Sequence, residues 1–551
     1  MKKLSVLLLI SSLLIGCAEL QPKDNSKNPF DWNGANLYFL LTDRFHNADP
    51  TNDLNFERTD ETAVLRGFKG GDIKGITAKI KEGYFTDLGI NAIWMTPLVE
   101  QIHGSTDEGT GVTYGFHGYW TRDWTALDPN FGTMEDLKEL VAVSHSNGIR
   151  VVLDAVINHT GPVTPMDSVW PDEWVRTTPA CTYKDYETAV TCTLVENLPD
   201  IKTESNEAVE LPEYLVAKWK EEGRYEKEMN ELNAFFERTG YPKAPRFYII
   251  KWLTDFIKDF GIDGFRADTV RHIEESVWAE FYKECQYSFE LWKKNNPDKV
   301  LDNNDFYTVG EVYGYEIPKN GSEFDFGDVK VDYYEHGFTS MINFEFRNNA
   351  HDGYEKLFSY YNNALRGSLR GKGIMNYVSS HDDSYPFDKE RNKPLEAGTK
   401  LLLSPGTSQV YYGDEVAREL IVKGANGDAN LRSEMDWTHY SINEEKMLIL
   451  EHWQKLGKFR RDHPAVGAGV HKMISKSPYV FERSYSKDNF SEVVVVGLDL
   501  EKGEKKLLVG ANFEEGDTLK DAYSGSFGKV KNGAVVIDSN YDVVLLEKFY
   551  N

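Results

Sequence analysis

Four strand-like segments of the chain each end in charged or imidazole side chains, and this repetition restricts the possible folds more than any other feature. The segments are GIDGFRADTVRHI (Gly261–Ile273), RVVLDAVINH (Arg150–His159), FYTVGEVY (Phe306–Tyr313) and GIMNYVSSHD (Gly373–Asp382). Each contains apolar, β-forming residues, as expected of a strand that leaves a buried core. A (β/α)8 barrel collects the C-terminal ends of its strands at one active-site face. The sequence therefore predicts an α/β protein, a (β/α)8 TIM barrel, whose site gathers these polar side chains.

In the first of these segments, Arg266 and Asp268 are two residues apart, so an extended strand places both side chains on the same face. A guanidinium beside a carboxylate lowers the pKa of the acid and keeps it ionised, which suits a nucleophile. An ordinary surface salt bridge at a strand end is the alternative for this pair alone. The three companion segments favour the functional interpretation.

Strand and helix signals alternate from Leu37 onward, which is typical of a parallel α/β architecture. LYFLLTDRF and NAIWMTPL are the first two predicted barrel strands, MINFEF and QVYYGDE are the sixth and eighth, and a helix is predicted from Met134 to Asn147. Residues 30–159 and 246–460 would form the two parts of the barrel.

Two further regions depart from the alternating pattern. Residues 160–245 are too long for a loop, so we expect an inserted B domain after the third strand. Residues 461–551 contain short β-rich runs separated by turn residues. These runs predict a C-terminal antiparallel β-sandwich.

The N-terminal residues 1–17 have the features of an export signal, with two lysines, an apolar run and the ending Leu-Ile-Gly-Cys. The run is too short to span a bilayer as a helix. Its ending resembles a bacterial lipobox, which would make Cys17 the lipidated first residue of a protein anchored at the outer membrane, on its periplasmic or its cell-surface face. A plain cleaved signal that releases a soluble periplasmic or secreted protein is the alternative. Residues 18–29 would then be a tether.

Charge and cysteine content narrow the function further. A net charge of −26 without a basic stripe argues against nucleic acid as a partner and favours a neutral substrate and bound cations. Cys285 lies in a helical-looking stretch, where we expect a buried thiol. Cys181 and Cys192 lie close together in a loop region of an exported protein, which predicts a local disulfide.

Five motifs, in order along the chain, resemble the signature segments of the alpha-amylase family, glycoside hydrolase family 13. They are DAVINH (Asp154–His159), LPDI (Leu198–Ile201), GFRADTVRH (Gly264–His272), GEVY (Gly310–Tyr313) and SSHD (Ser379–Asp382). The resemblance covers essentially the whole chain after residue 30 and implies the same three-part layout. EQIHG (Glu100–Gly104), YGFHGYW and LPDI resemble exported bacterial alpha-amylases that act on starch and maltodextrins.

The resemblance implies a retaining glycoside hydrolase with three carboxylates in its site. Asp268 would be the nucleophile, Glu311 the general acid/base, and Asp382 the third carboxylate, which bonds to sugar hydroxyls as the ring flattens. Retaining hydrolysis passes through a cation-like sugar, which one carboxylate traps while the other protonates the leaving oxygen. The two carboxyl groups should lie about 5–5.5 Å apart. A neighbouring ionised carboxylate should help to raise the pKa of the acid.

The same resemblance implies a set of substrate contacts. They are Tyr119, Trp120, His159, Arg266, Arg271, His272, His381, Asp428 and Arg432. Tyr119 and Trp120 would form an aromatic platform, with core packing as the alternative. Asp428 and Arg432 would hold sugar hydroxyls, although their spacing of four also suits a plain helix pair. Arg271 replaces the Lys that the family usually has, which keeps the charge and changes the hydrogen-bond geometry.

The resemblance also implies bound calcium. Asn158, Asp200 and the carbonyl of His272 would pin the B domain to the barrel, since calcium takes hard oxygen ligands. Thr191 marks a departure from the fungal pattern, because no acid precedes Cys192. A second site would use Asn47, Asp49, Asn52, Asp53, the Gly70 carbonyl and Asp72, with a polar Asx-rich turn as the alternative. No chloride site is expected, because Asp-Ser-Tyr-Pro follows His381-Asp382 without the arginine that such a site uses.

We therefore expect a monomeric, endo-acting hydrolase of α-1,4-glucosidic bonds in starch, glycogen or maltodextrins. A neopullulanase- or cyclomaltodextrinase-like enzyme, or a transglycosylating α-glucan enzyme, is the alternative within the family. A glucan-binding protein without catalysis is a third hypothesis. The presence of all three carboxylates argues against it.

Overall fold

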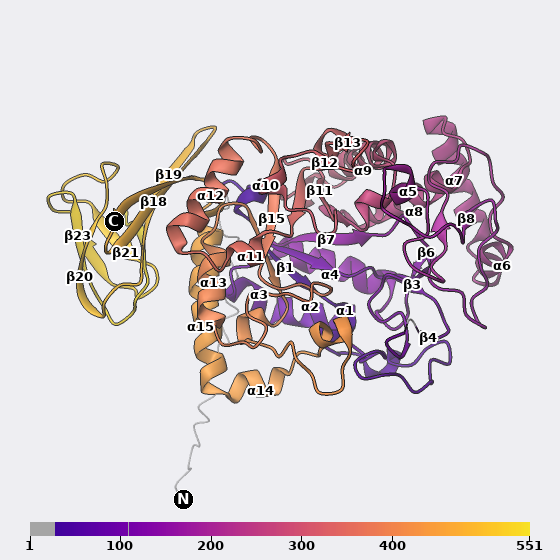
Figure 1. Cartoon of the computed structure of the whole chain (residues 1–551), viewed down its shortest axis with the longest axis horizontal. Helices are drawn as coiled ribbons and strands as arrows, with labels where there is room; N and C mark the ends of the chain where they lie inside the picture. The colour runs from indigo at the N-terminus through magenta and orange to yellow at the C-terminus, as the bar shows by residue number, and fades with distance from the viewer. Residues whose placement is uncertain (1–27, 108, 551) are drawn as a thin grey trace, which may run out of the picture.

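Eight parallel strands close into a barrel at the centre of the molecule (Figure 1). The computed structural model describes residues 28–107 and 109–550. The barrel strands are β1 (Asn36–Leu40), β2 (Ala92–Met95), β7 (Arg150–Ala155), β10 (Gly264–Ala267), β11 (Tyr307–Gly310), β14 (Ser340–Asn343), β15 (Gly373–Tyr377) and β16 (Thr407–Tyr411). They follow one another around the barrel in chain order, and β1 pairs with β16 to close it. The predicted barrel is confirmed, including its sixth and eighth strands.

Every residue of these eight strands is buried. This explains their nearly continuous apolar sequences, because a parallel sheet is covered on both faces. The main helices around the barrel are α2 (Ile73–Lys81), α3 (Tyr84–Asp87), α4 (Met134–Ser146), α8 (Pro245–Phe260), α9 (Glu275–Asn295), α12 (Tyr354–Arg366), α13 (Pro394–Leu402) and α15 (Glu444–Asp462). Cys285 lies on α9 as a buried free thiol, as predicted.

Helix α4 shows why its ends were predictable from sequence. Thr133 Oγ1 accepts a hydrogen bond from the Asp136 backbone N–H, and the Asp136 carboxylate accepts one from the Thr133 N–H. This reciprocal capping box fixes the first turn. The helix ends at Ser146, one residue before the predicted end.

The region between β7 and α8 forms a compact insertion with helices of its own. It holds β8 (Val175–Arg176), α5 (Glu187–Val190), β9 (Asp200–Ile201), α6 (Glu213–Glu221) and α7 (Tyr225–Thr239). Trp174 of the insertion stacks on Trp252 of α8, with ring centroids 6.2 Å apart and planes 2° apart. The sequence did not predict α6 and α7. It also did not predict the excursion after β2, which contains β3 (Val99–Gln101), β4 (Thr106–Asp107), β5 (Val112–Thr113) and β6 (Thr121–Leu127).

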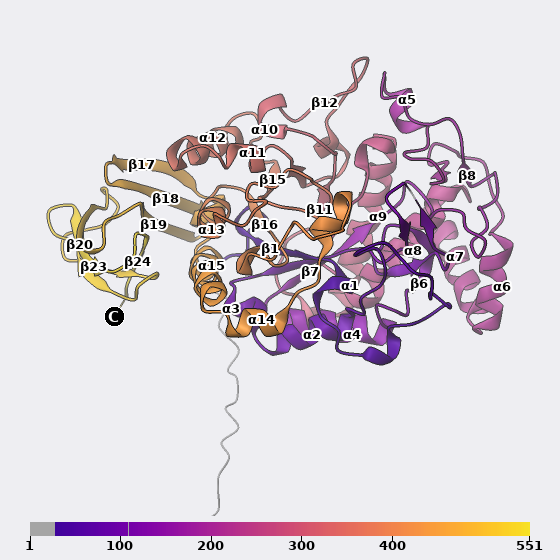
Figure 2. The same ribbon diagram turned by 60° about the horizontal axis from the view of Figure 1, so that its bottom comes forward.

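The C-terminal region forms two antiparallel sheets around a separate apolar core. The larger sheet contains β17 (Val470–Lys476), β18 (Tyr479–Lys487), β19 (Phe490–Leu498), β24 (Val544–Lys548), β21 (Thr518–Asp521) and β22 (Phe527–Lys529), and the smaller one β20 (Gly503–Leu508) and β23 (Ala534–Ser539). Val495 of the larger sheet and Val535 of the smaller one belong to the shared core. Both views place these strands at one end of the molecule and α6 and α7 at the other (Figures 1 and 2).

Short elements complete the described chain. They are α1 (Thr42–Phe45), α10 (Ile317–Asn320), α11 (Phe346–Asn349), α14 (Trp437–Ile442), α16 (Ala465–Ala468), β12 (Phe324–Asp325) and β13 (Lys330–Val331), with several single 3-10 turns. The predicted export signal, Cys17 and the tether up to residue 27 lie outside the described residues. Within residues 28–107 and 109–550, no helix combines the length and the apolar character needed to cross a bilayer.

His463 connects the end of α15 to the larger C-terminal sheet. Its Nδ1 lies 3.0 Å from Glu492 Oε2, and its Nε2 lies 2.9 Å from Glu547 Oε2. Burial lowers the pKa of His463, but the hydrogen bonds to the two glutamates outweigh this effect and raise its pKa to about 9. The imidazolium therefore holds two strands of the C-terminal sheet to the barrel at neutral pH.

We predict that His463→Gln destabilises the protein in a pH-dependent manner. The charged ring stabilises the fold fully below its unfolded pKa of about 6.5, and this contribution disappears as the pH rises through about 9. The free energy of unfolding should fall by up to about 3 kcal/mol near pH 6 and by much less near pH 10. Calorimetric melting at both pH values measures this difference. His439→Gln, on the outer helix α14, serves as the control, and equal destabilisation by His463→Gln at both pH values would contradict the prediction.

Candidate active site

One buried guanidinium joins three carboxylates at the C-terminal ends of neighbouring barrel strands. Arg266 Nη1 lies 2.9 Å from Asp154 Oδ1 and 2.6 Å from Asp268 Oδ1, and Nη2 lies 2.9 Å from Glu311 Oε1. The parallel register pairs Arg266 of β10 with Asp154 of β7. Asp268 and Glu311 directly follow β10 and β11, and their backbone N–H groups continue the ladder to the carbonyls of the preceding strand. The barrel register itself thus brings these four residues together.

Glu311 is held in a position and an environment that suit a proton donor. Its Oε2 accepts the backbone N–H of Thr269 at 3.0 Å, and Thr269 adopts a left-handed conformation with φ of 49°. Burial raises the pKa of Glu311 to about 8, and the charges of Asp268 and Asp382 act in the same direction, while Arg266 opposes them. Its carboxyl group therefore carries a proton at neutral pH.

Asp382 completes the trio of acids that the sequence predicted. It follows β15 and His381, whose Nε2 lies 3.8 Å from Asp382 Oδ2. Burial raises the pKa of Asp382 to about 6, Arg266 and Arg432 lower it, and Asp268 raises it. The three predicted acids are therefore close enough to influence one another's protonation.

Tyr119 and the two predicted histidines form a second part of the site. The Tyr119 hydroxyl donates to Asp154 Oδ2 at 2.8 Å, and its ring stacks on His381 with centroids 5.4 Å apart. His159 Nε2 lies 3.1 Å from the Tyr119 carbonyl oxygen. Burial lowers the pKa of His159 and of His381, so both rings are neutral at neutral pH. Tyr119 and His381 therefore present an aromatic face and a neutral imidazole beside the acids, while the Nε2–H of His159 is used by the Tyr119 carbonyl.

Asp428 and Arg432 also lie in this region. They form an ion pair with each other, and each has a further contact within the site. They lie in a short 3-10 helix, with Arg432 Nη1 2.8 Å from Asp428 Oδ2. Arg66 binds the other oxygen of Asp428 at 2.8 Å, and Arg432 Nε donates to the His381 carbonyl at 3.0 Å. This link attaches the pair to the loop that carries Asp382.

Two predicted substrate contacts are placed differently from expectation. Trp120 is buried and packs with Ile102 and Leu198, so core packing accounts for it and the aromatic platform reduces to Tyr119. The Nδ1 of His272 lies 2.9 Å from the Ala189 carbonyl, and its Nε2 accepts from Arg271 Nε at 3.3 Å. Both ring nitrogens of His272 are occupied within the protein, which leaves Arg271 as the residue of this pair with free donors.

Two site residues were not identified from the sequence. Asp154 accepts hydrogen bonds from Arg266, Tyr119 and the indole of Trp94, the last at 3.1 Å. His117 Nδ1 accepts from the Tyr119 N–H at 3.1 Å. Both residues lie inside motifs that the sequence analysis quoted, so motif membership was the available signal.

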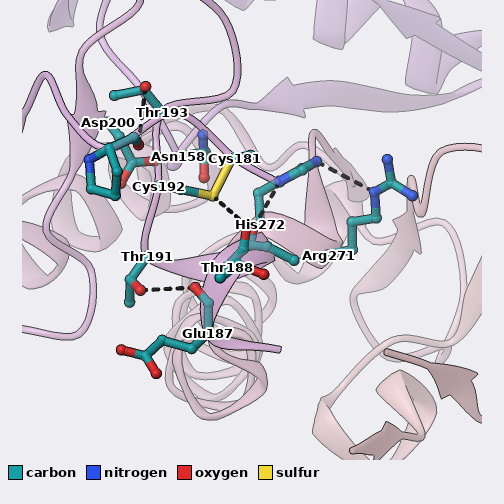
Figure 3. Close-up of a disulfide and its surroundings, with 12 residues drawn as sticks. Asn158, Cys181, Glu187, Thr188, Thr191, Cys192, Thr193, Asp200, Arg271 and His272 are labelled. Atoms are coloured by element: carbon teal, nitrogen blue, oxygen red, sulfur yellow. Dashed lines mark hydrogen bonds between the residues drawn. A yellow bond between two sulfur atoms is a disulfide. The ribbon is translucent and has the colours of Figure 1, made fainter. Parts of the chain in front are cut away.

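Asp200 lies in a setting that fits a bound cation. The Ile201 N–H donates to the Asn158 carbonyl at 2.7 Å, which brings Asn158 and Asp200 together. Figure 3 shows both residues and His272 close to the disulfide that joins Cys181 and Cys192. Neither oxygen of the Asp200 carboxylate accepts a hydrogen bond from a described residue. Arg176 Nε lies 2.9 Å from Oδ2 without hydrogen-bonding geometry.

Arg176 is the positive partner of this buried carboxylate, and it compensates the charge only in part. Burial raises the pKa of Asp200 to about 9, because the nearby arginine only partly compensates for the loss of water. A buried charge without hydrogen bonds is costly unless a counter-charge compensates it. The part of the chain that the structure describes contains no cluster of three or more His, Cys, Asp or Glu side chains suited to a metal. A cation at Asp200 would therefore take its other ligands from amide and carbonyl oxygens, which suits calcium.

The second predicted calcium loop favours the alternative of a polar turn. Asp72 Oδ1 caps α2 by accepting the Gly75 N–H at 2.6 Å, and its Oδ2 accepts two further backbone N–H groups. Asp49 binds Lys74 at 2.6 Å. Asn47 Nδ2 donates to Asp53 Oδ1 at 2.8 Å, and both of these atoms lie beside Gly70. The buried side-chain oxygens of Asn47 and Asn52 have no partner among the described residues.

Comparison with known proteins places the chain in a family. Residues 39–439 match the family model described as "Alpha amylase, catalytic domain". The chain is 34% identical over 521 residues to the periplasmic alpha-amylase of Escherichia coli (strain K12), covering 84% of this chain and 72% of that protein. It is 26% identical over 518 residues to a cyclomaltodextrin glucanotransferase of Bacillus sp. (strain 6.6.3), covering 92% of this chain and 64% of that protein.

A solved structure shows the same fold. The crystal structure of an Anoxybacillus alpha-amylase has a TM-score of 0.66 to this protein at 22% identity, covering 95% of this chain and 100% of that chain. With the barrel, the acids at its strand ends and the matching family model, the chain belongs to the alpha-amylase family of glycoside hydrolases.

Proposed function

We propose that the protein hydrolyses α-1,4-glucosidic bonds within starch, glycogen or maltodextrin chains and retains the anomeric configuration. The observation that supports this proposal most directly is the Arg266 guanidinium shared by Asp268 and Glu311. Retaining enzymes need a nucleophilic carboxylate and a proton-donating carboxyl group close together on the same bond. One guanidinium that contacts both groups keeps them close to each other.

In this proposal the two acids divide the chemistry between them. Asp268 attacks the anomeric carbon while Glu311 donates its proton to the leaving glycosidic oxygen. A raised pKa of about 8 keeps that proton on Glu311 until it is needed. Glu311 then acts as the base that activates water, and water releases the sugar from Asp268. Asp382 and the neutral His381 bind hydroxyls of the same glucose unit, and Tyr119 stacks on its ring.

Transglycosylation is the second candidate within this family. The relatives named cyclomaltodextrin glucanotransferases favour it, because the covalent intermediate in a retaining site reacts with a sugar hydroxyl as well as with water. Cyclic or lengthened products from linear maltodextrins would identify that activity. The hypothesis of a binding protein without catalysis does not explain why Asp268, Glu311 and Asp382 are all present in this site.

We predict that Asp268→Asn and Glu311→Gln each lower kcat on soluble starch by about 10³-fold or more, because each removes a group that makes or breaks a bond in the reaction. Asp259→Asn, on the exposed side of α8, should keep full activity and serves as a matched control. Melting curves of the purified variants check that each is folded. Near wild-type turnover by either site variant would refute the role assigned to that residue.

We also propose that one calcium ion is held by Asn158, Asp200 and the carbonyl oxygen of His272. Its charge would compensate the buried Asp200 carboxylate and fasten the inserted region to the loop that follows β10. The Asp200 oxygens, which accept no hydrogen bond from a described residue and are only partly compensated by Arg176, support this assignment. The ion has a structural role and takes no part in the chemical step.

Removal of calcium should therefore lower the melting temperature, because an ion that binds only the folded state stabilises it. Asp200→Asn removes the buried charge and should reduce the response to chelator and to added calcium. Asp49→Asn, in the polar turn, should keep the full response. A wild-type melting curve that does not change in strong chelator would eliminate this calcium site.

We propose finally that the protein is exported and anchored by a lipid on Cys17 at the outer membrane. The Leu-Ile-Gly-Cys sequence supports the anchor, and the periplasmic relative from Escherichia coli supports export. Cells that express the protein should incorporate labelled fatty acid into it, and Cys17→Ser should abolish the label while Cys285→Ser keeps it. Labelling that persists in Cys17→Ser would rule out the lipid anchor.

A further inference from the structure

Asp383, the neighbour of Asp382, is fixed on both of its carboxylate oxygens. Its Oδ1 accepts the backbone N–H of Tyr385 at 3.1 Å. Its Oδ2 accepts the hydroxyl of Tyr377 at 2.6 Å and the Nε–H of Arg347. The side chain is 3% exposed, so solvent does not screen these bonds. Asp383 is therefore a fixed point at the start of the turn that leads away from the site.

The partners of Asp383 come from a barrel strand and from the short helix that follows another barrel strand. Tyr377 is the last residue of β15, and Arg347 lies in α11, which follows β14. The ring of Tyr377 packs edge-on against Phe344, with centroids 5.8 Å apart. Asp383 thus ties the loops after the sixth and seventh barrel strands to each other.

Asp382 has no comparable restraint of its own. Its side chain is 28% exposed, and Nε2 of the neutral His381 ring lies 3.8 Å from its Oδ2. No hydrogen bond from a described side chain or backbone group contributes to its pKa. The direction of the Asp382 carboxylate is consequently set by the backbone of residues 381–385, which Asp383 anchors.

Asp383 also acts on Asp382 through its charge. Burial is the largest cause that raises the pKa of Asp382, and the negative charge of Asp383 adds to it. The charged and titratable groups that face Asp382 from the surrounding elements are Arg266, Asp268, Glu311, Tyr313, Tyr377, His381, Asp383 and Arg432. Within this set Asp383 alone combines a charge effect with a backbone link to Asp382.

We infer that Asp383 is a positioning residue for the hydrolysis. Arg347 and Tyr377 hold Asp383, which in turn fixes the turn that directs Asp382 at the bound sugar. Asp383 also adds its negative charge to the surroundings of Asp382. This inference rests on the proposed function. Asp383 itself contacts no reacting group. Its effect on the reaction passes through Asp382.

The test compares Asp383→Asn with a matched variant outside the site. Asp332 has the same three kinds of partner: its Oδ1 accepts the Tyr334 N–H at 3.1 Å, and its Oδ2 binds the Ser322 hydroxyl at 2.7 Å and the Lys372 ammonium. Asp332→Asn therefore reproduces the loss of one half-buried, hydrogen-bonded charge without touching Asp382. Each single variant is compared with the wild-type enzyme, and a linear maltooligosaccharide of defined length is the substrate in all assays.

Asp383→Asn should lower kcat by about 10- to 100-fold with a smaller change in KM, since misplacement of a reacting group costs this much. Loss of the neighbouring charge should also lower the pKa of Asp382, so the acid limb of the pH profile of kcat/KM should move to lower pH. Tyr377→Phe removes one bond and keeps the charge, so it should reduce kcat without moving the acid limb. Asp332→Asn should leave both kcat and the pH profile unchanged.

Wild-type kcat and an unshifted acid limb in Asp383→Asn would overturn the inference, as would an equal loss in Asp332→Asn. If Asp383→Asn does not fold, Tyr377→Phe decides, and a folded Tyr377→Phe with wild-type kcat overturns the inference. A wild-type enzyme without activity on α-glucans would remove the proposed function together with this inference. If the wild-type enzyme is active on α-glucans and Asp383→Asn is unaffected, the inference about Asp383 is wrong while the proposed function stands.

Discussion

The buried guanidinium of Arg266 is the interaction on which the site depends. A cluster of carboxylates inside a protein is unfavourable unless a positive charge compensates it. Arg266 binds Asp154, Asp268 and Glu311 from one position, because the barrel register places Arg266 opposite Asp154 and delivers the two other acids from adjacent strand ends. One cation cannot neutralise three anions, and burial leaves Glu311 protonated. The same charge balance that stabilises the cluster thus provides both an anionic group and a proton donor.

The inserted region also contains a buried carboxylate, but the charge of that carboxylate is compensated in a different way. Asp200 is buried, and its oxygens receive no hydrogen bond from a described residue, whereas Asp383 is buried and fully bound by Arg347, Tyr377 and a backbone N–H. The first arrangement leaves room for the proposed calcium ion beside the partial compensation by Arg176, and the second is complete within the chain. At Asp200 the fold would depend on an added ion. At Asp383 the chain itself supplies every contact that positions the loop of Asp382.

The sequence predicted the features that depend on local patterns. The barrel strands are continuous apolar runs because both faces of the sheet are buried. Helix α4 begins at a capping box that is formed by neighbouring residues of the sequence, Thr133 to Asp136. Features that depend on tertiary contacts were missed. Asp154 became a site residue only through its register with Arg266, and α6 and α7 lie in a stretch whose length suggested an insertion but not its helices. The alternatives for Trp120 and for the Asp49 loop stayed open in the sequence because the contacts that bear on them, with Leu198 and Lys74, come from distant parts of the chain.

Retention of configuration is the central claim of the proposed function, and the guanidinium shared by Asp268 and Glu311 supports it by keeping the two groups close. The most direct measurement is proton NMR of the fresh reducing ends that the wild-type enzyme releases from a linear maltodextrin, recorded before mutarotation. Double displacement predicts that the α-anomer appears first and that the β-anomer grows in only by mutarotation. Initial release of the β-anomer would contradict the mechanism and the roles assigned to both acids.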